Sequence, residues 1–206
     1  MTDDEPPLVA ANGLGLRGKR GWIYHDVDLR LPADTPTAVT GPAGSGRSML
    51  LLTLAGRATP STGNLTVAGE SDRAKIRDLV AVARVTAGVE LEPELRVVEH
   101  IREAELLTGG HYKTALGLEL EPTALVADLA ADDAVLFAVA LALTGKPKVV
   151  VVDDVDIRAT PAQQRRIWTA FGQSGVTVIA STVDGEIAAA TGATVVAVDG
   201  SADARV

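Results

Sequence analysis

One glycine-rich segment of the chain reads Gly41-Pro42-Ala43-Gly44-Ser45-Gly46-Arg47-Ser48. The apolar residues Ala38 and Val39 before it predict a strand, and the leucine-rich run that begins at Met49 predicts a helix after it. Such a segment between a strand and a helix is typical of a phosphate-binding loop, here with Arg47 where lysine is usual. A glycine-rich turn without a ligand is the alternative interpretation.

Glycines suit a phosphate-binding loop because no Cβ blocks the approach of the anion to successive backbone N–H groups. The helix that follows directs its positive end toward the same anion. We therefore expect Arg47 to supply positive charge to the outer phosphates of a nucleotide. Ser48 would offer its hydroxyl to Mg²⁺.

The composition excludes several other classes of protein. A length of 206 residues suits one α/β domain, and the absence of cysteine excludes disulfides and thiolate metal sites. The net charge of −8 argues against a nucleic-acid surface, and the basic cluster at residues 17–20 is typical of a solvated loop. The acidic residues 1–5 do not resemble a signal peptide, and the apolar run at 134–143 is too short to cross a bilayer. These features predict a cytoplasmic protein.

Apolar patterns predict strands and helices that alternate along most of the chain, with only weak helical segments between 111 and 127. In the strand 23–31 the odd-numbered residues are expected to face the core. Asp132 or Asp133 is expected to cap the helix that follows, and Thr160 to cap the helix that begins at Pro161. Alternation around a phosphate loop predicts a mostly parallel sheet with helices on both faces. The expected strands are 8–14, 23–31, 37–40, 64–67, 80–85, 149–152, 176–180 and 194–198, and the expected helices are 48–56, 97–107, 134–143, 161–171 and 186–190.

A second motif is Val149-Val150-Val151-Val152-Asp153-Asp154. Four β-branched residues in a row predict a central parallel strand, whose carboxyl end is where ligands bind in open α/β sheets. Asp153 is expected to hold Mg²⁺ through water, and Asp154 to polarise an attacking water. A surface turn after a strand is the alternative.

The order and spacing of these segments resemble those of the ATP-binding cassette (ABC) ATPases, the nucleotide-binding domains of transporters. The resemblance implies a P-loop NTPase fold of the ABC type in a single domain, with an antiparallel β subdomain at about 8–36 and 63–69 and a helical subdomain at about 88–130. It also implies ATP with Mg²⁺ as ligand and a separate membrane-spanning subunit as partner. The matching segments are 26–29, 41–48, 60–69, 97–101, 147–154 and 175–184.

The chain departs from the family at the positions that handle the γ-phosphate. Arg47 keeps the charge of the usual lysine, and Met49 loses a hydroxyl but keeps its backbone amide. Asp154 replaces the catalytic glutamate, and a carboxylate retracted by about 1 Å can cost about a hundredfold in rate. Three further replacements are Ala87 or Thr86 for the glutamine, Leu129-Ala130-Ala131-Asp132-Asp133 for the Leu-Ser-Gly-Gly-Gln signature, and Val183 for the switch histidine.

The altered signature would place two carboxylates near a nucleotide of like charge. At about 4 Å and an effective dielectric constant near 20, one such contact costs on the order of 4 kcal/mol. This disfavours a symmetric homodimer and leaves a heterodimer with an intact cassette open. The residues considered for stacking on adenine are Leu16, Arg17, Trp22 and Tyr24, with packing as the alternative for Trp22.

Three functions are compatible with these residues. The first is a transporter-type ATPase subunit, and the second is a nucleotide-binding regulatory or assembly module with little turnover. The third, an unrelated phosphate-loop enzyme such as a small-molecule kinase, is disfavoured by the matched spacing outside the loop. Because several γ-phosphate positions have changed while the phosphate loop is largely kept, we predict nucleotide binding with very slow hydrolysis.

Overall fold

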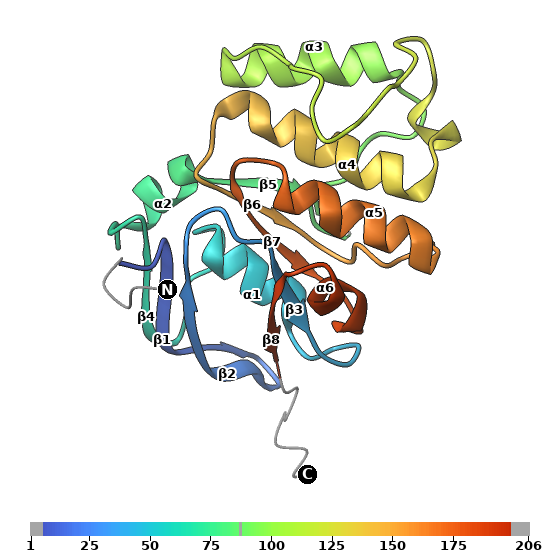
Figure 1. Ribbon diagram of the computed structural model, residues 1–206. Coiled ribbons are helices and arrows are strands. Elements are labelled where there is room, and N and C mark those ends of the chain that lie inside the picture. The colour runs from blue at the N-terminus through green and yellow to red at the C-terminus, as the bar shows by residue number, and fades with distance from the viewer. Residues whose placement is uncertain (1–5, 87, 199–206) are drawn as a thin grey trace.

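A computed structural model describes residues 6–86 and 88–198 of the chain, so that Ala87 and the acidic start lie outside the described residues. The structure contains two sheets (Figure 1). A three-stranded antiparallel sheet has the order β2-β1-β4, and a five-stranded sheet has the order β5-β6-β7-β3-β8, with all its pairs parallel. The predicted α/β class with a mostly parallel core sheet is therefore confirmed. The strands are β1 (Val9–Gly18), β2 (Gly21–Leu31), β3 (Thr37–Thr40), β4 (Thr62–Val67), β5 (Val80–Arg84), β6 (Val149–Val152), β7 (Thr177–Ser181) and β8 (Thr194–Ala197).

Helices cover both faces of the parallel sheet (Figure 1). The helix α1 lies between the two sheets, whereas α4 and α5 pack on the opposite face and α3 lies outside α4. Among the described residues, no helix is long and apolar enough to cross a membrane. The helices are α1 (Arg47–Leu54), α2 (Arg73–Leu79), α3 (Val97–Thr108), α4 (Ala131–Ala142), α5 (Pro161–Gly172) and α6 (Glu186–Ala190), with short 3-10 helices at η1 (Val126–Asp128) and η2 (Leu143–Gly145).

The strand β6 contributes to two hydrophobic cores. Val149 and Val151 belong to the core that β6 shares with α1 and the antiparallel sheet, and Val150 and Val152 to the core that contains α4 and α5. All four side chains are buried, as the run of β-branched residues predicted. The carboxyl end of β6 is thereby fixed from both sides of the sheet.

Local sequence signals placed α5 correctly. Thr160 accepts a hydrogen bond from the amide of Gln163 at 3.3 Å, and the Gln163 side chain accepts one from the amide of Thr160 at 2.9 Å. Pro161 occupies the first turn. This reciprocal capping fixes the start of α5 where the sequence predicted it.

The expected alternation of β2 is wrong in its first half. Tyr24 is buried, whereas Ile23 and His25 are only half-buried, and the alternation follows the prediction only from Val27 onward. The break occurs at Asp26, which has a φ of 51° and lies at the register shift between the pairs Leu14–Val27 and Leu16–Tyr24. An irregularity of this kind moves the side chains before it to the other face of the sheet.

Two further expectations need correction. Residues 109–125 contain no helix, and the first helical turn after α3 is η1. The sequence patterns did not predict the short helix α2, which is capped by Asp72, whose side chain accepts hydrogen bonds from the amides of Ala74 and Lys75. Aspartate is a common residue at this capping position.

Candidate phosphate-binding site

The glycine-rich segment connects the carboxyl end of β3 to the first turn of α1. Gly46 has a φ of 92°, and a Cβ added there would lie 2.5 Å from the carbonyl oxygen of Ile23. Gly41 has a φ of 151°, and its Cβ would lie 2.4 Å from the carbonyl oxygen of Val198. The tight packing of neighbouring backbone therefore requires glycine at both positions.

The start of α1 has donors available for an anion. Gly46 occupies the capping position without any side-chain hydrogen bond to the first turn, so the first N–H groups of the helix are not capped. Pro42, Ala43 and Gly44 are exposed, which leaves the loop open to a ligand. The half-buried Met49 packs against the core behind the loop.

Arg47 does not project into solvent. Its side chain is 10% exposed, and Nη1 donates hydrogen bonds of 2.7 Å to the carbonyl oxygens of both Gly41 and Thr182. Nη2 lies 3.3 Å from Oδ1 of Asp154. The positive charge that the sequence assigned to the phosphates thus also holds parts of the site together.

Asp153 and Asp154 lie at the carboxyl end of β6, as predicted, but they have different surroundings. Asp153 is fully buried, and its Oδ1 accepts a hydrogen bond from the hydroxyl of Ser181. Its Oδ2 is buried without a hydrogen-bond partner in the part of the chain that the structure describes, and the same holds for the hydroxyl of Ser45 in the loop. Buried polar atoms of this kind usually have partners, so these two atoms are suited to a ligand or its water.

The residues fit a magnesium nucleotide better than a metal alone. Among the described residues, no group of three or more His, Cys, Asp or Glu side chains is arranged to hold a metal ion. Mg²⁺ is commonly held by one or two protein oxygens together with substrate phosphates. Ser48, in the first turn of α1, and Asp153 would be the protein oxygens in such a site.

The backbone and side chain of Asp154 are both held in place. The residue has a φ of 49°, and its amide donates to the hydroxyl of Ser181 at 2.7 Å. Its Oδ2 accepts a hydrogen bond of 3.1 Å from Thr86, one of the two residues aligned with the family glutamine. Burial and the charge of Asp153 raise the pKa of Asp154, and Thr86 and Arg47 only partly oppose them.

Arg84, at the end of β5, is a site residue that the sequence analysis missed. Its Nη2 donates to the carbonyl oxygens of Asp153 at 2.9 Å and Asp154 at 2.6 Å. Burial lowers the pKa of the guanidinium, although Asp154 and Asp153 oppose this effect. A charged residue at the end of an otherwise apolar run, Val80–Ala83, was the available signal.

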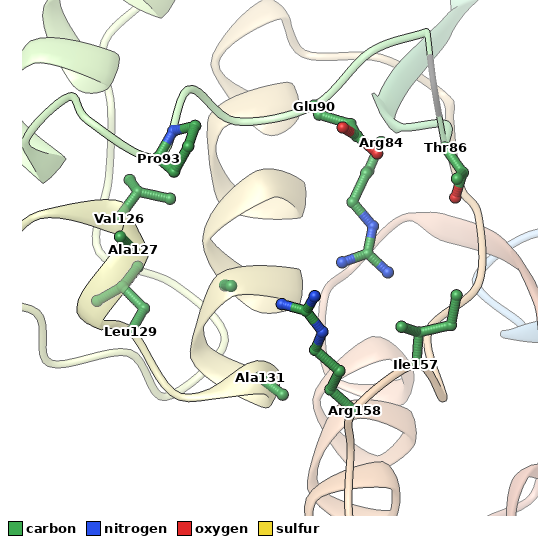
Figure 2. Close-up of a pocket in the computed structure, with 11 residues that line it drawn as sticks. Arg84, Thr86, Glu90, Pro93, Val126, Ala127, Leu129, Ala131, Ile157 and Arg158 are labelled. Atoms are coloured by element: carbon green, nitrogen blue, oxygen red, sulfur yellow. The ribbon is translucent and has the colours of Figure 1, made fainter.

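A cavity of about 610 Å³ lies beside these residues. Figure 2 shows the side chains that line it. The guanidinium groups of Arg84 and Arg158 point toward one another across the cavity. Thr86 and Ile157 line one wall, at the right of the view. Leu129 lines the opposite wall. The cavity therefore connects the surroundings of Asp154 with the segment that replaces the family signature.

The expectation that Asp132 or Asp133 caps α4 is wrong. The capping position is Ala130, and both carboxylates instead contact Arg166 of α5, with Nη1 at 2.5 Å from Asp132 and 2.7 Å from Asp133. Burial alone would raise the pKa of Asp132, but hydrogen bonds from Arg166 and Gln163 outweigh it and lower that pKa. Both carboxylates therefore share one cation in the folded chain.

The candidates for adenine stacking differ in whether their side chains are accessible to a ligand. Tyr24 is buried and donates a 2.6 Å hydrogen bond to the hydroxyl of Thr53, so its assignment to the base is wrong. Leu16 is also buried. Arg17 lies 5.7 Å from the ring centre of Trp22, and this pair at the tip of the β1–β2 hairpin remains available.

Comparison with known proteins agrees with this geometry. The family model described as "ABC transporter" matches residues 24–156. The cytochrome c biogenesis ATP-binding export protein CcmA of Cupriavidus necator is 36% identical over 104 residues, which cover 50% of this chain and 46% of that protein. The aliphatic sulfonates import ATP-binding protein SsuB 3 of Pseudomonas syringae pv. tomato is 29% identical over 189 residues, covering 86% and 67%.

Solved structures show the same fold at low sequence identity. A nucleotide-free ATP-binding cassette from an ABC transporter superimposes with a TM-score of 0.75 at 15% identity, covering 94% of this chain and 88% of that one. An ATP-binding subunit of an ABC transporter gives a TM-score of 0.73 at 17% identity, covering 94% and 86%. The chain spans about half the length of the first curated relatives that it matches.

Proposed function

The chain belongs to the ABC transporter family, and from this premise we propose that it is an ATP-binding subunit that binds Mg-ATP through Gly41–Met49, with Ser48 and Asp153 holding the metal ion. Two observations carry the proposal: the uncapped start of α1, whose Arg47 contacts Asp154, and the buried Oδ2 of the adjacent Asp153, which has no hydrogen-bond partner among the described residues. Phosphate oxygens suit the uncapped N–H groups, and Mg²⁺ suits the free carboxylate oxygen.

We further propose that hydrolysis is weak or absent. Asp154, which would act on the attacking water, is shorter than glutamate, and both of its carboxylate oxygens already have partners in Arg47 and Thr86. The position of the switch histidine carries Val183, whose side chain is exposed. The water-activating group and its usual neighbours are therefore changed together, while the loop that would bind the nucleotide is kept.

A regulatory or assembly module for a membrane partner is the second candidate. It is supported by the pairing of Asp132 and Asp133 with Arg166, which replaces a glycine-rich segment by a salt-bridged one. In either case we propose a single ABC-type domain with the β and helical subdomains stated above. It would act at the cytoplasmic side of a membrane through a separate membrane-spanning subunit, or in a heterodimer with an intact cassette.

Calorimetry with Mg-ATP and Mg-ADP, followed by a phosphate-release assay, tests the proposal. We expect saturable binding and a turnover far slower than about one cycle per second, a rate common among enzymes. Arg47→Ala should weaken binding, whereas Asp154→Asn should hardly change the slow turnover. Absence of binding at millimolar nucleotide would overturn the proposal, and fast turnover that Asp154→Asn abolishes would identify a working aspartate base.

A further inference from the structure

The guanidinium of Arg47 contacts the carboxyl ends of three neighbouring strands. Gly41 follows β3, Asp154 follows β6 and Thr182 follows β7, and the sheet order places β6, β7 and β3 side by side. Nη1 bonds to the carbonyl oxygens of Gly41 and Thr182, and Nη2 contacts Asp154. One side chain therefore ties the phosphate loop to two other segments that border it.

The guanidinium makes these contacts with two nitrogens that lie in one plane. The guanidinium holds its N–H donors in a rigid fork, whereas the ammonium of lysine is a single nitrogen on a flexible stem. Turning the fork to meet a new acceptor changes its contacts with Gly41, Thr182 and Asp154 at the same time. Arg47 thus couples the position of the phosphate loop to the positions of Thr182 and Asp154.

The contact with Asp154 is the one that a phosphate would replace most readily. At 3.3 Å it is longer than the two 2.7 Å bonds to the carbonyl oxygens. The backbone of Asp154 is held independently by Arg84 and Ser181, so the loss of this contact frees Oδ1 of the carboxylate without unfolding the turn. Oδ2 keeps its hydrogen bond from Thr86. A phosphate oxygen is a strong acceptor for the same guanidinium nitrogen.

We propose that Arg47 is a positioning residue that exchanges the Asp154 carboxylate for a phosphate oxygen when the phosphate loop is occupied. This exchange would change the contacts of Asp154 and of residues 181–184. The inference rests on the proposed nucleotide binding. Thr182 is the point of contact with this segment, because its carbonyl oxygen binds Arg47 and its amide bonds to Val39 of β3. The next amide, that of Val183, donates to Oδ2 of Asp156. A turn of the guanidinium consequently changes the environment of hydrogen-bonded amides whose exchange can be followed.

Hydrogen exchange of peptides that cover residues 181–185 tests the link. In the wild type we expect saturating Mg-ADP to change the exchange rate of these amides by about threefold to tenfold. Arg47→Lys, tested at a Mg-ADP concentration that saturates the variant according to its own measured affinity, should lose this change. The control Arg57→Lys, at an exposed arginine after α1, should keep it. A change that persists in Arg47→Lys overturns the inference.

A second variant tests the exchange of acceptors without altering Arg47. Asp154→Asn removes the competing charge, so we expect tripolyphosphate to bind about threefold to tenfold more tightly. Asp156→Asn removes a nearby charge whose carboxylate accepts from the amide of Val183, and its effect should be clearly smaller. Equal effects of the two variants would overturn the inference. If the wild type binds neither Mg-ADP nor tripolyphosphate, the proposed function falls. If it binds them without a change at 181–185, only the inference falls.

Discussion

The hydroxyl of Ser181 donates to Oδ1 of Asp153, so that Oδ2 is the free oxygen of a fully buried carboxylate. The bond joins the ends of β7 and β6. It fixes the orientation of the carboxylate before any ligand arrives. Site residues that are held in this way bind with less loss of conformational freedom.

Asp153→Asn should remove the contribution of Mg²⁺ to nucleotide affinity. The amide cannot carry the charge that a hard cation prefers, so ATP should bind about equally well with Mg²⁺ and with EDTA, whereas the wild type should gain about tenfold or more from Mg²⁺. Calorimetry under both conditions measures this ratio. Asp156→Asn is the control that should keep the wild-type ratio.

Gly46→Ala should destabilise the protein, because its Cβ would lie 2.5 Å from the carbonyl oxygen of Ile23 at a φ of 92°. We expect a loss of about 1–3 kcal/mol in the free energy of unfolding. Gly44→Ala is a matched control with a φ of 81°, at which the added Cβ would have no atom within 4 Å among the described residues, its chain neighbours apart. Chemical denaturation should show a smaller loss for the control, and equal losses would contradict the role of the contact with Ile23.

Arg166→Ala should destabilise the packing of α4 on α5, because it leaves Asp132 and Asp133 without their shared cation. The side chain of Arg166 is 40% exposed, so solvent screens the ion pairs in part. We therefore expect a loss of about 1–2 kcal/mol in the free energy of unfolding near neutral pH. The control is Arg165→Ala, at the exposed neighbouring position on α5. Denaturation of both variants measures the difference.

This difference should depend on pH in a defined direction. The folded-state pKa of Asp132 is lowered, so its contribution to stability is fully present above the unfolded value of about 3.9 and is lost as the pH falls through the folded value. Wild type and Arg166→Ala should therefore converge in stability below about pH 4. A difference that stays constant as the pH falls well below the unfolded value would show that the contribution is not ionic.

Tyr24→Phe should lower the free energy of unfolding by about 1 kcal/mol without changing nucleotide affinity. The substitution removes the hydroxyl that bonds to Thr53 in the core, while Thr53 still donates to the carbonyl oxygen of Met49. Thermal unfolding and calorimetry with Mg-ATP measure the two effects. A clear loss of affinity would restore Tyr24 as a candidate for contact with the base.

Local signals in the sequence were sufficient for the parts of the fold that depend on neighbours in the chain. The cap at Thr160 and the buried strand Val149–Val152 follow from a few consecutive residues. The turn at Gly41–Ser48 was equally clear because strand, glycines and helix follow one another directly. The parallel sheet then followed from the alternation of these elements.

Features that depend on residues far apart in the chain could not be predicted in the same way. Arg84 bonds to the carbonyl oxygens of residues about seventy positions later, and Arg166 pairs with carboxylates more than thirty positions earlier. The sequence offered the capping of α4 as an adequate role for Asp132, and only the packing of α5 shows the ion pair. The irregularity at Asp26 likewise reversed the faces of the first half of β2.

The alternating valines of β6 also determine how cooperatively the protein unfolds. Val149 and Val151 belong to one hydrophobic core, and Val150 and Val152 belong to the other. If either core unfolds and β6 leaves the sheet, the other core therefore loses packing contacts as well. Neither core can persist as a folded fragment once this strand leaves the sheet. Heating should consequently produce one concerted transition in calorimetry rather than two successive steps.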